Sequence, residues 1–272
     1  MILLIILIIL IILIIFFNIN NNIKYKNNEY FDNNDTLDTN NTLDINDTYK
    51  NSNNLLINLS NDIFKNIDIV YYINLDYRTD RKDHFLNEMS KINFPSNKIT
   101  RISAIYDKRG YIGCTKSHIK TLTEFIKSNK NICIIFEDDF EFIKDITLIY
   151  TQFNNVFNYN IDFDIIMLSG NNLQDKSSNY TFLSKVFNGQ TASGYMVNKK
   201  FAKILLDNLI EGEQLLSNTY KNDDNTKDFL YANDQYWKIL QPYYNWYIFN
   251  PKIGKQMASY SDIVKNYVDY NI

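Results

Sequence analysis

The sequence predicts an α/β fold in which helices flank a mostly parallel sheet, behind an N-terminal membrane anchor. Beyond residue 66, short apolar runs alternate with stretches of helical periodicity, an order typical of a parallel sheet covered by helices. One apolar run ends abruptly in three consecutive carboxylates, and residues 1–17 are almost pure Ile and Leu. With 45% hydrophobic and 15% aromatic residues among 272, the chain can bury a large core.

Residues 1–17 are interpreted as a signal anchor of a single-pass membrane protein, and the alternative is the apolar region of a signal peptide. As a helix they would reach roughly 25 Å, close to the thickness of thin endoplasmic-reticulum membranes. No small-residue cleavage site follows, so we expect the segment to be retained in an endoplasmic-reticulum or Golgi-type secretory membrane. The nearest basic residues, Lys24 and Lys26, follow the segment, and the positive-inside rule would place them in the cytoplasm. That conflicts with a lumenal enzyme, so the orientation stays open.

A polar tether separates this segment from the folded part. Residues 18–66 are mostly Asn, Asp and Thr, with little periodicity, which is typical of disorder. The predicted organisation is therefore an anchor at 1–17, a tether at 18–66 and a folded domain at 67–272.

The expected strands are short apolar runs bounded by polar residues. In chain order they cover 67–75, 99–105, a run ending at Glu137, 165–168, 192–197 and 247–249.

The expected helices follow most of these strands. The first is capped by Asp76 or Thr79, has an apolar face around Phe85 and Met89, and ends before Pro95. The second begins after a polar loop at 107–113, and the next two cover 143–157 and 199–209. Residues 216–228 are polar and predict a surface loop.

The acidic triplet Glu137, Asp138 and Asp139 follows a buried strand at the edge where ligands bind in open α/β sheets. Three carboxylates repel one another unless a hard cation such as Mn²⁺ or Mg²⁺ lies among them, and such cations also bind phosphates. We predict a metal site at these three residues. The alternative is an acidic turn in which Asp138 or Asp139 caps a helix.

The end of the first strand places Asn74 and Asp76 at the same edge of a parallel sheet. Arg78 and Arg81 follow in the first helical turn, where a cation opposes the helix dipole, so an anionic ligand or a partner such as Asp80 would explain them. The alternative is a solvated cluster of charges.

A second candidate element runs from Gly110 to His118. Gly113 and Ser117 lie near a helix start, where backbone N–H groups can bind phosphate, and His118 could donate to a ligand oxygen. A lone helical histidine is more often structural.

One further acid, Asp234, follows a predicted loop and is the remaining candidate for a catalytic role, with a helix N-cap as its alternative. In contrast, Asp162 and Asp164 precede their strand, which places them at the opposite edge, and we interpret them as structural.

Composition excludes several classes of protein. The net charge of −3 provides no basic patch, so we expect no nucleic-acid partner. Of the two cysteines, neither fits a zinc spacing, and Cys133 within an apolar run is most simply a core residue.

Taken together, these segments resemble glycosyltransferase family 25, the group of lipooligosaccharide and procollagen galactosyltransferases. The resemblance covers about residues 68–263 in five pieces that occur in the family's order. Those pieces are Ile73-Asn74-Leu75-Asp76 with Arg78, Asp80 and Arg81; Gly113-Cys114 with Ser117-His118; Glu137-Asp138-Asp139; Gly194-Tyr195 with Ala202; and Pro251 with Gln256 and Ser261-Asp262-Ile263.

The resemblance implies a GT-A type, Rossmann-like nucleotide-sugar fold and a divalent metal, usually Mn²⁺. It also implies transfer of a sugar, commonly galactose from UDP-galactose, to a hydroxyl of a glycan or protein acceptor, with inversion. On that basis Asp138, Asp139 and Asp234 are the candidate catalytic residues, with Asp234 on the acceptor side. The candidate donor-binding residues are Asn74, Asp76, Arg78, Arg81, Gly113, Ser117 and His118.

Two alternatives stay open. Three acids at a strand end also suit a metal-dependent nucleotidyltransferase or phosphohydrolase. The chain could instead be a catalytically inactive, membrane-tethered protein that binds sugar nucleotides.

Overall fold

The computed structural model describes residues 62–171, 174–221, 228–263 and 265–269, all within one compact unit, Asn53–Ile272. The predicted anchor and all but the last five residues of the predicted tether lie outside the described residues. Within the described ranges, no helix combines the length and the apolar character needed to cross a membrane.

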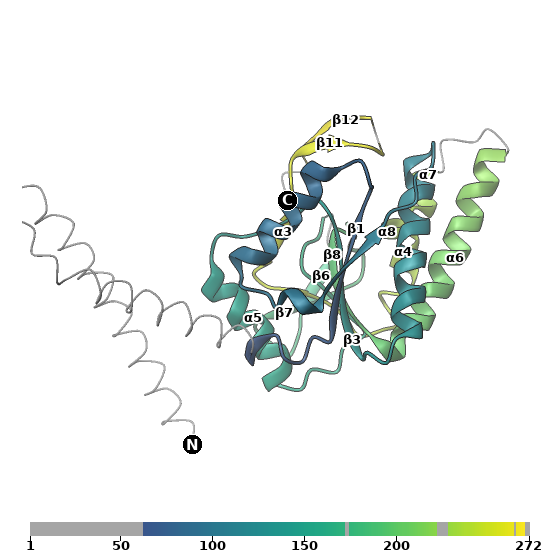
Figure 1. Cartoon of the computed structure of the whole chain (residues 1–272). Helices are drawn as coiled ribbons and strands as arrows, with labels where there is room; N and C mark the ends of the chain where they lie inside the picture. The colour runs from purple at the N-terminus through teal and green to yellow at the C-terminus, as the bar shows by residue number, and fades with distance from the viewer. Residues whose placement is uncertain (1–61, 172–173, 222–227, 264, 270–272) are drawn as a thin grey trace, which may run out of the picture. The chain divides into compact units, whose positions relative to one another are not determined.

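An eight-stranded sheet forms the centre of the molecule, in the order β2-β1-β3-β8-β5-β9-β7-β6 (Figure 1). β1 pairs in parallel with both β2 and β3, and β5 pairs in parallel with β9. The remaining pairings are antiparallel, so β8 and β7 run against the other six strands. The strands are β1 Ile69–Asn74, β2 Ile99–Ser103, β3 Ile132–Glu137, β5 Ile165–Met167, β6 Asp175–Ser177, β7 Leu183–Val186, β8 Gly194–Asn198 and β9 Trp246–Phe249.

Helices cover both faces of this sheet: α3 and α5 lie on one side, and α4 and α6 lie on the other (Figure 1). The long helices are α3 Thr79–Lys91, α4 Gly110–Lys127, α5 Ile146–Asn158 and α6 Lys199–Lys221, with short helices η1 Ser96–Lys98, α7 Asp228–Tyr231, α8 Asn233–Tyr236 and η3 Trp237–Ile239. Two small sheets complete the described fold, β4 Phe140–Phe142 with β10 Gly254–Gln256, and β11 Ser259–Ser261 with β12 Asn266–Val268.

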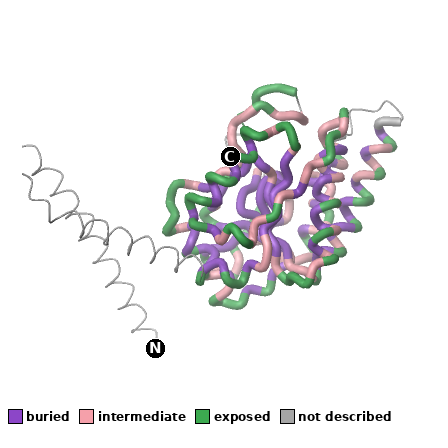
Figure 2. The backbone as a smooth tube through the Cα atoms, viewed as in Figure 1, coloured by how far each residue is buried: buried purple, intermediate pink, exposed green. Residues whose placement is uncertain are grey.

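The alternation of side chains along the central strands divides the core into two clusters. In β3, Ile134 and Phe136 pack with α3 and α5, whereas Cys133 and Ile135 pack with α4 and α6. Because successive residues of a strand point to opposite faces, a continuous apolar run is needed where both faces are covered. Figure 2 shows the sheet and the inward sides of the helices as buried. Cys133 is a core residue, as expected.

The mixed α/β class and the predicted strands are confirmed, but the sheet contains more antiparallel pairing than expected. β8 enters between β3 and β5 in the reverse direction. A strand's direction depends on the path of the chain between strands, which an apolar run does not encode.

Several expected boundaries were wrong. Arg78, rather than Asp76 or Thr79, is the N-cap residue of α3, and no side chain caps this helix. α4 already begins at Gly110, inside the expected loop. α6 continues to Lys221, so residues 216–221 are helical rather than a loop, and Leu216 is buried in that helix.

The folded part also begins before residue 67. Ile63 and Phe64 are buried, and the Phe64 ring packs 4.7 Å from that of Phe94 and 5.4 Å from that of Phe153. These two residues therefore belong to the core rather than to the tether, because their burial removes apolar surface from water.

Candidate active site

A pocket of about 120 Å³ opens at the carboxyl ends of β1 and β3. Its wall comes from the end of β1, the loop at 104–107, the first two turns of α4, the acidic triplet and the C-terminal segment at 256–263. Segments far apart in the sequence therefore meet at the edge where the sequence predicted a site.

Arg81 holds two of the three acids. Its Nη1 atom lies 3.0 Å from Asp138 Oδ1 and 3.0 Å from Asp139 Oδ2. Its Nη2 atom donates to Ser259 Oγ at 2.7 Å and to the Tyr260 carbonyl at 2.9 Å. The predicted alternative of a solvated charge is therefore wrong for Arg81, which is buried and joins α3 to the acids and to β11.

Asp138 is fully engaged by protein groups. One oxygen accepts from Arg81, and the other accepts from Asn74 Nδ2 at 2.7 Å. This contact places Asn74, at the end of β1, at the same edge as the acidic triplet, as predicted, but Asn74 itself does not line the pocket. Asp138 thus serves to lock β1, β3 and α3 together.

Asp139 keeps one oxygen without a protein partner. Oδ2 is ion-paired with Arg81 and accepts a hydrogen bond from Gln256 Nε2 at 3.1 Å, but the buried Oδ1 has no hydrogen bond among the described residues. Burial raises the pKa of Asp139 to about 7, and the neighbouring Glu137 and Asp138 add to the rise while Arg81 opposes it. A buried carboxylate in this state is suited to bind a cation, which would satisfy the oxygen and favour the charged form.

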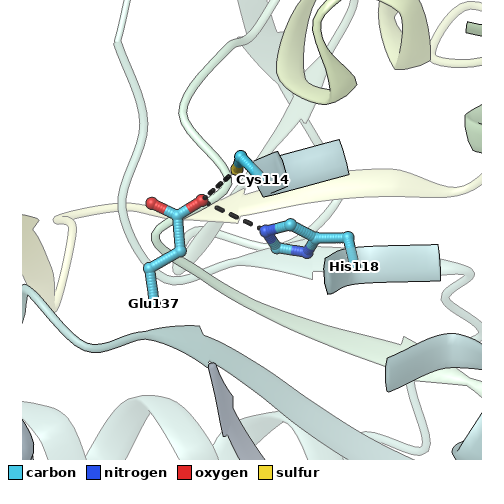
Figure 3. A group of neighbouring side chains, drawn as sticks. All are labelled: Cys114, His118 and Glu137. Carbon is cyan, nitrogen blue, oxygen red and sulfur yellow. Dashed lines mark hydrogen bonds and ion pairs between the residues drawn. The ribbon is translucent and has the colours of Figure 1, made fainter. Parts of the chain in front are cut away.

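Glu137 turns toward α4, away from Arg81's two partners. Its Oε1 lies 3.1 Å from His118 Nε2 and 3.4 Å from Cys114 Sγ (Figure 3). His118 is buried, and its Nδ1 lies 2.9 Å from the Tyr195 hydroxyl on β8. Despite desolvation, the hydrogen bond from His118 lowers the pKa of Glu137. His118 therefore positions Glu137 and does not line the pocket that the sequence assigned to it.

Two kinds of metal ligand are thus present. Asp139, with Glu137 nearby in the same wall, offers hard oxygen ligands. Within the part of the chain that the structure describes, the three-residue group with donor atoms all within 4.8 Å is Cys114, His118 and Glu137. The predicted set, Glu137, Asp138 and Asp139, is therefore not the set of residues whose donor atoms lie this close together.

Asp76 and Arg78 lie outside the pocket lining. Asp76 is exposed and accepts from Arg101 at 2.6 Å and Ser103 at 2.9 Å, and the hydrogen bond from Arg101 is the main reason that its pKa is lowered. Arg78 pairs with Asp80 and with Asp262. Of the alternatives predicted for Arg78, the protein partner is therefore the one observed.

Gly113 and Ser117 shape the pocket wall. A Cβ on Gly113 would lie 2.6 Å from the Ile105 carbonyl oxygen, so only glycine allows this close approach of the loop. The Ser117 hydroxyl accepts from the Ile105 N–H at 2.8 Å and donates to the Gly113 carbonyl at 2.7 Å. Ser117 does not cap α4, which begins seven residues earlier at Gly110.

Asp234 borders a second pocket that shares four lining residues with the first: Cys114, Glu137, Gln256 and Ile263. Its Oδ2 accepts from the Thr191 N–H at 3.0 Å, and its pKa is raised mainly by burial. The helix-cap alternative is wrong, because Ala232 is the N-cap of α8 and its side chain makes no cap. Asp162 and Asp164 bond to Asn245 at 2.9 and 2.8 Å, as expected of structural acids.

Sequence reasoning gave no role to Gln256, Tyr195 or Ser259, which hold Asp139, His118 and Arg81. Gln256 and Tyr195 belong to the motifs on which the family resemblance rests, and these motifs could have indicated a role for both residues. No sequence motif indicated a role for Ser259.

Residues 108–225 match the family model "Glycosyltransferase family 25 (LPS biosynthesis protein)". Comparison with curated protein sequences gives no match. Among solved structures, the chain is similar to A197 from STIV, at 9% identity and a TM-score of 0.37, covering 67% of this chain and 81% of that one.

It is also similar to a glycosyltransferase involved in glycosylation of the major capsid of PBCV-1, at 9% identity and a TM-score of 0.37, covering 66% and 79%. A third is the mannose-1-phosphate geranyltransferase from Thermus thermophilus, at 6% identity and a TM-score of 0.39, covering 68% and 73%.

Proposed function

We propose, from the match of residues 108–225 to the model of glycosyltransferase family 25, that this chain belongs to that family and moves a hexose from a UDP-sugar to a hydroxyl of a glycan or protein acceptor, with inversion. The observation that carries the proposal is the buried Asp139 oxygen without a protein partner, in the wall of a pocket at the carboxyl ends of parallel strands. The corresponding fold is the GT-A type.

A divalent cation, Mn²⁺ or Mg²⁺, would be held at Asp139 with Glu137, and would supply positive charge against the donor's diphosphate. The donor set fits, because both residues line the pocket and Asp139 has an oxygen available. Arg81 keeps Asp139 oriented toward the pocket by holding its other oxygen.

The reaction itself is a single displacement. The acceptor oxygen forms a bond to the anomeric carbon, the bond from that carbon to the diphosphate breaks, and the acceptor's proton passes to a carboxylate. We assign that carboxylate to Asp234, because it borders the adjoining pocket and its pKa is raised by burial, which makes it a stronger base than an exposed aspartate.

The test is a donor assay with Mn²⁺ in which the full-length protein and an Asp139→Asn variant are compared. We expect UDP release and sugar transfer from the wild type, and loss of at least about a hundredfold in the variant, since an amide is a poor ligand for a hard cation. The matched control is Asp162→Asn, because Asp162 is exposed, lies at the opposite edge and bonds to Asn245.

Retained turnover in Asp139→Asn would refute the assignment. Release of free sugar phosphate, or of pyrophosphate from a nucleotide, would favour the phosphohydrolase or nucleotidyltransferase alternative. Failure of the wild type to bind any nucleotide sugar in calorimetry would favour the inactive binding protein.

The cellular location is a separate proposal. Residues 1–17 would hold the enzyme in a secretory membrane, and what supports this is their Ile and Leu content. Full-length protein should stay in the membrane pellet after alkaline extraction, whereas a variant lacking residues 1–52 should be extracted; equal extraction would contradict the anchor.

A further inference from the structure

Cys114, His118 and Glu137 point toward one another between α4 and the end of β3 (Figure 3). Cys114 and His118 are four residues apart on α4, so one helical face presents both side chains to Glu137. The sequence spacing gave no zinc motif, because the third residue comes from a different element.

The distances among the donor atoms suit a tetrahedral metal. With bonds of about 2.3 Å to sulfur and about 2.0 Å to nitrogen and oxygen, tetrahedral geometry separates sulfur from oxygen by about 3.5 Å and nitrogen from oxygen by about 3.3 Å. Here Cys114 Sγ lies 3.4 Å from Glu137 Oε1, and His118 Nε2 lies 3.1 Å from the same oxygen. These two distances suit a single cation, and all three donor atoms lie within 4.8 Å of one another.

Tyr195 supplies the outer contact that a metal-binding histidine requires. Its hydroxyl lies 2.9 Å from His118 Nδ1 and can accept a hydrogen bond from that nitrogen when Nε2 binds a metal. The ring is thereby fixed in the orientation that keeps Nε2 toward Cys114 and Glu137.

The surroundings favour a cation and leave room for one. Cys114 is half-buried, and Glu137, Asp139 and Asp234 all contribute negative charge near its sulfur. Cys114 and Glu137 both line the two adjoining pockets, so a fourth ligand position faces open space that a water molecule can occupy.

We propose that Cys114, His118 and Glu137 form a binding site for a thiophilic divalent cation, Zn²⁺ by preference, distinct from the hard-cation position at Asp139. On binding, the Cys114 thiol releases its proton to solvent, and the cation takes the place of that proton and of the His118–Glu137 hydrogen bond. Sulfur and imidazole ligands select Zn²⁺ over Mn²⁺ and Mg²⁺.

The bound ion would have a consequence for transfer. Because Glu137 would be drawn to Zn²⁺, it would no longer be available beside Asp139, and the ion would occupy space at the wall that the two pockets share. Zn²⁺ therefore inhibits the proposed transferase, while the binding site itself does not depend on that reaction.

The experiment uses full-length protein in detergent, freed of any histidine tag and of metal. Competition with a chromophoric chelator should show one equivalent of Zn²⁺ per chain, and Cd²⁺ should produce the ultraviolet sulfur-to-metal charge-transfer band. Cys114→Ser should abolish the band, and Cys114→Ser and His118→Gln should each weaken Zn²⁺ binding at least about a hundredfold. Tyr195→Phe should weaken it about tenfold, as the loss of an outer contact does.

Matched controls come from the same chain. Cys133→Ser and His84→Gln change the other cysteine and the other histidine and should leave the band and the affinity unchanged. Circular dichroism establishes whether each variant is folded. If His118→Gln does not fold because His118 is buried, the Cys114→Ser variant alone tests the proposed metal site.

A band that persists in Cys114→Ser, or that is lost in Cys133→Ser, would overturn the proposal, as would wild-type protein that binds no Zn²⁺. In the activity arm, chelation should restore transfer by the Zn²⁺-treated wild type. If no sugar transfer is found under any condition, the proposed function fails while the binding measurements still decide the metal site.

Discussion

Arg81 is the residue on which the geometry of the site depends most, because its guanidinium contacts Asp138, Asp139 and two groups of β11. Arg81→Met should lower the free energy of unfolding by about 3–5 kcal/mol, since it leaves buried carboxylates without their counter-charge. Urea unfolding measures the loss. The control is Lys127→Met, which breaks an exposed pair with Glu124 and should cost about 0–1 kcal/mol. Equal losses in the two variants would show that the Arg81 network does not stabilise the fold.

Asp139 should make stability depend on pH. Its pKa is about 7 in the folded protein and about 4 in an unfolded chain, so the folded state retains a proton that the unfolded state loses. The stability that this proton contributes is fully present below about pH 4 and is lost as pH rises through about 7.

The side chain introduced by Asp139→Asn is neutral at every pH, so this variant should not lose stability as the pH rises. In metal-free buffer, the wild type should therefore lose stability relative to the variant between about pH 5 and about pH 8, and added Mn²⁺ should reverse the loss. Denaturant unfolding at the two pH values measures it. A constant difference between the two proteins would contradict the raised pKa.

At the scale of elements, Gly113 sets how closely the 104–107 loop approaches α4. Gly113→Ala places a Cβ 2.6 Å from the Ile105 carbonyl and 3.0 Å from the Asp107 amide nitrogen, so backbone must move. The expected cost is about 1–3 kcal/mol, together with weaker donor binding, because the loop forms part of the pocket wall.

The comparison variant is Gly212→Ala in α6, where the new Cβ would lie 3.1 Å from the Tyr236 Cδ1 atom. The Tyr231 carbonyl oxygen would lie 3.2 Å from the same Cβ, so these neighbours need to shift by only a few tenths of an ångström, and alanine favours a helix over glycine. Thermal unfolding and donor titration should separate the two variants; similar behaviour would mean that the loop tolerates the added atom.

The apolar runs predicted most of the central strands because most of these strands, such as β1, β3 and β8, are buried along nearly their whole length, although in β2 only Ile102 is buried. β4 and β10 were not predicted, since each has three residues and exists through its pairing with the other, 112 or more residues away. The early end predicted for α6 has a similar cause: polar residues after Leu209 suggested a loop, whereas the buried Leu216 continues its inward face.

Only some of the contacts in the candidate site could be predicted from the sequence. Asn74 and Asp138 meet because parallel strands end at one edge, which the sequence could indicate. The nearby Asp80 was an expected alternative partner of Arg78. The further partners of Arg78 and His118, Asp262 and Tyr195, come from distant segments. Contacts between residues so far apart in the sequence leave no recognisable pattern in the neighbouring residues.

At the scale of the whole molecule, the folded unit extends to the N-terminal side of the predicted boundary. A variant lacking residues 1–52 should keep the unfolding free energy of the full-length protein, because it retains the entire compact unit. A variant lacking residues 1–66 loses Ile63 and Phe64, and truncation of a buried phenylalanine alone costs about 3–5 kcal/mol. Calorimetry compares them, with Phe64→Ala as the point-mutation equivalent. Equal stability of the two truncated forms would restore residue 67 as the boundary.

Arg81 and Asp139 depend on Gln256, Ser259 and Tyr260, which are translated 117 or more residues after them. A nascent polypeptide in which residues 256–260 are still inside the ribosomal exit tunnel can therefore form its early strands and helices but cannot organise its acidic centre. Premature termination shortly before residue 256 would likewise leave the acidic centre unformed even where the sheet has formed.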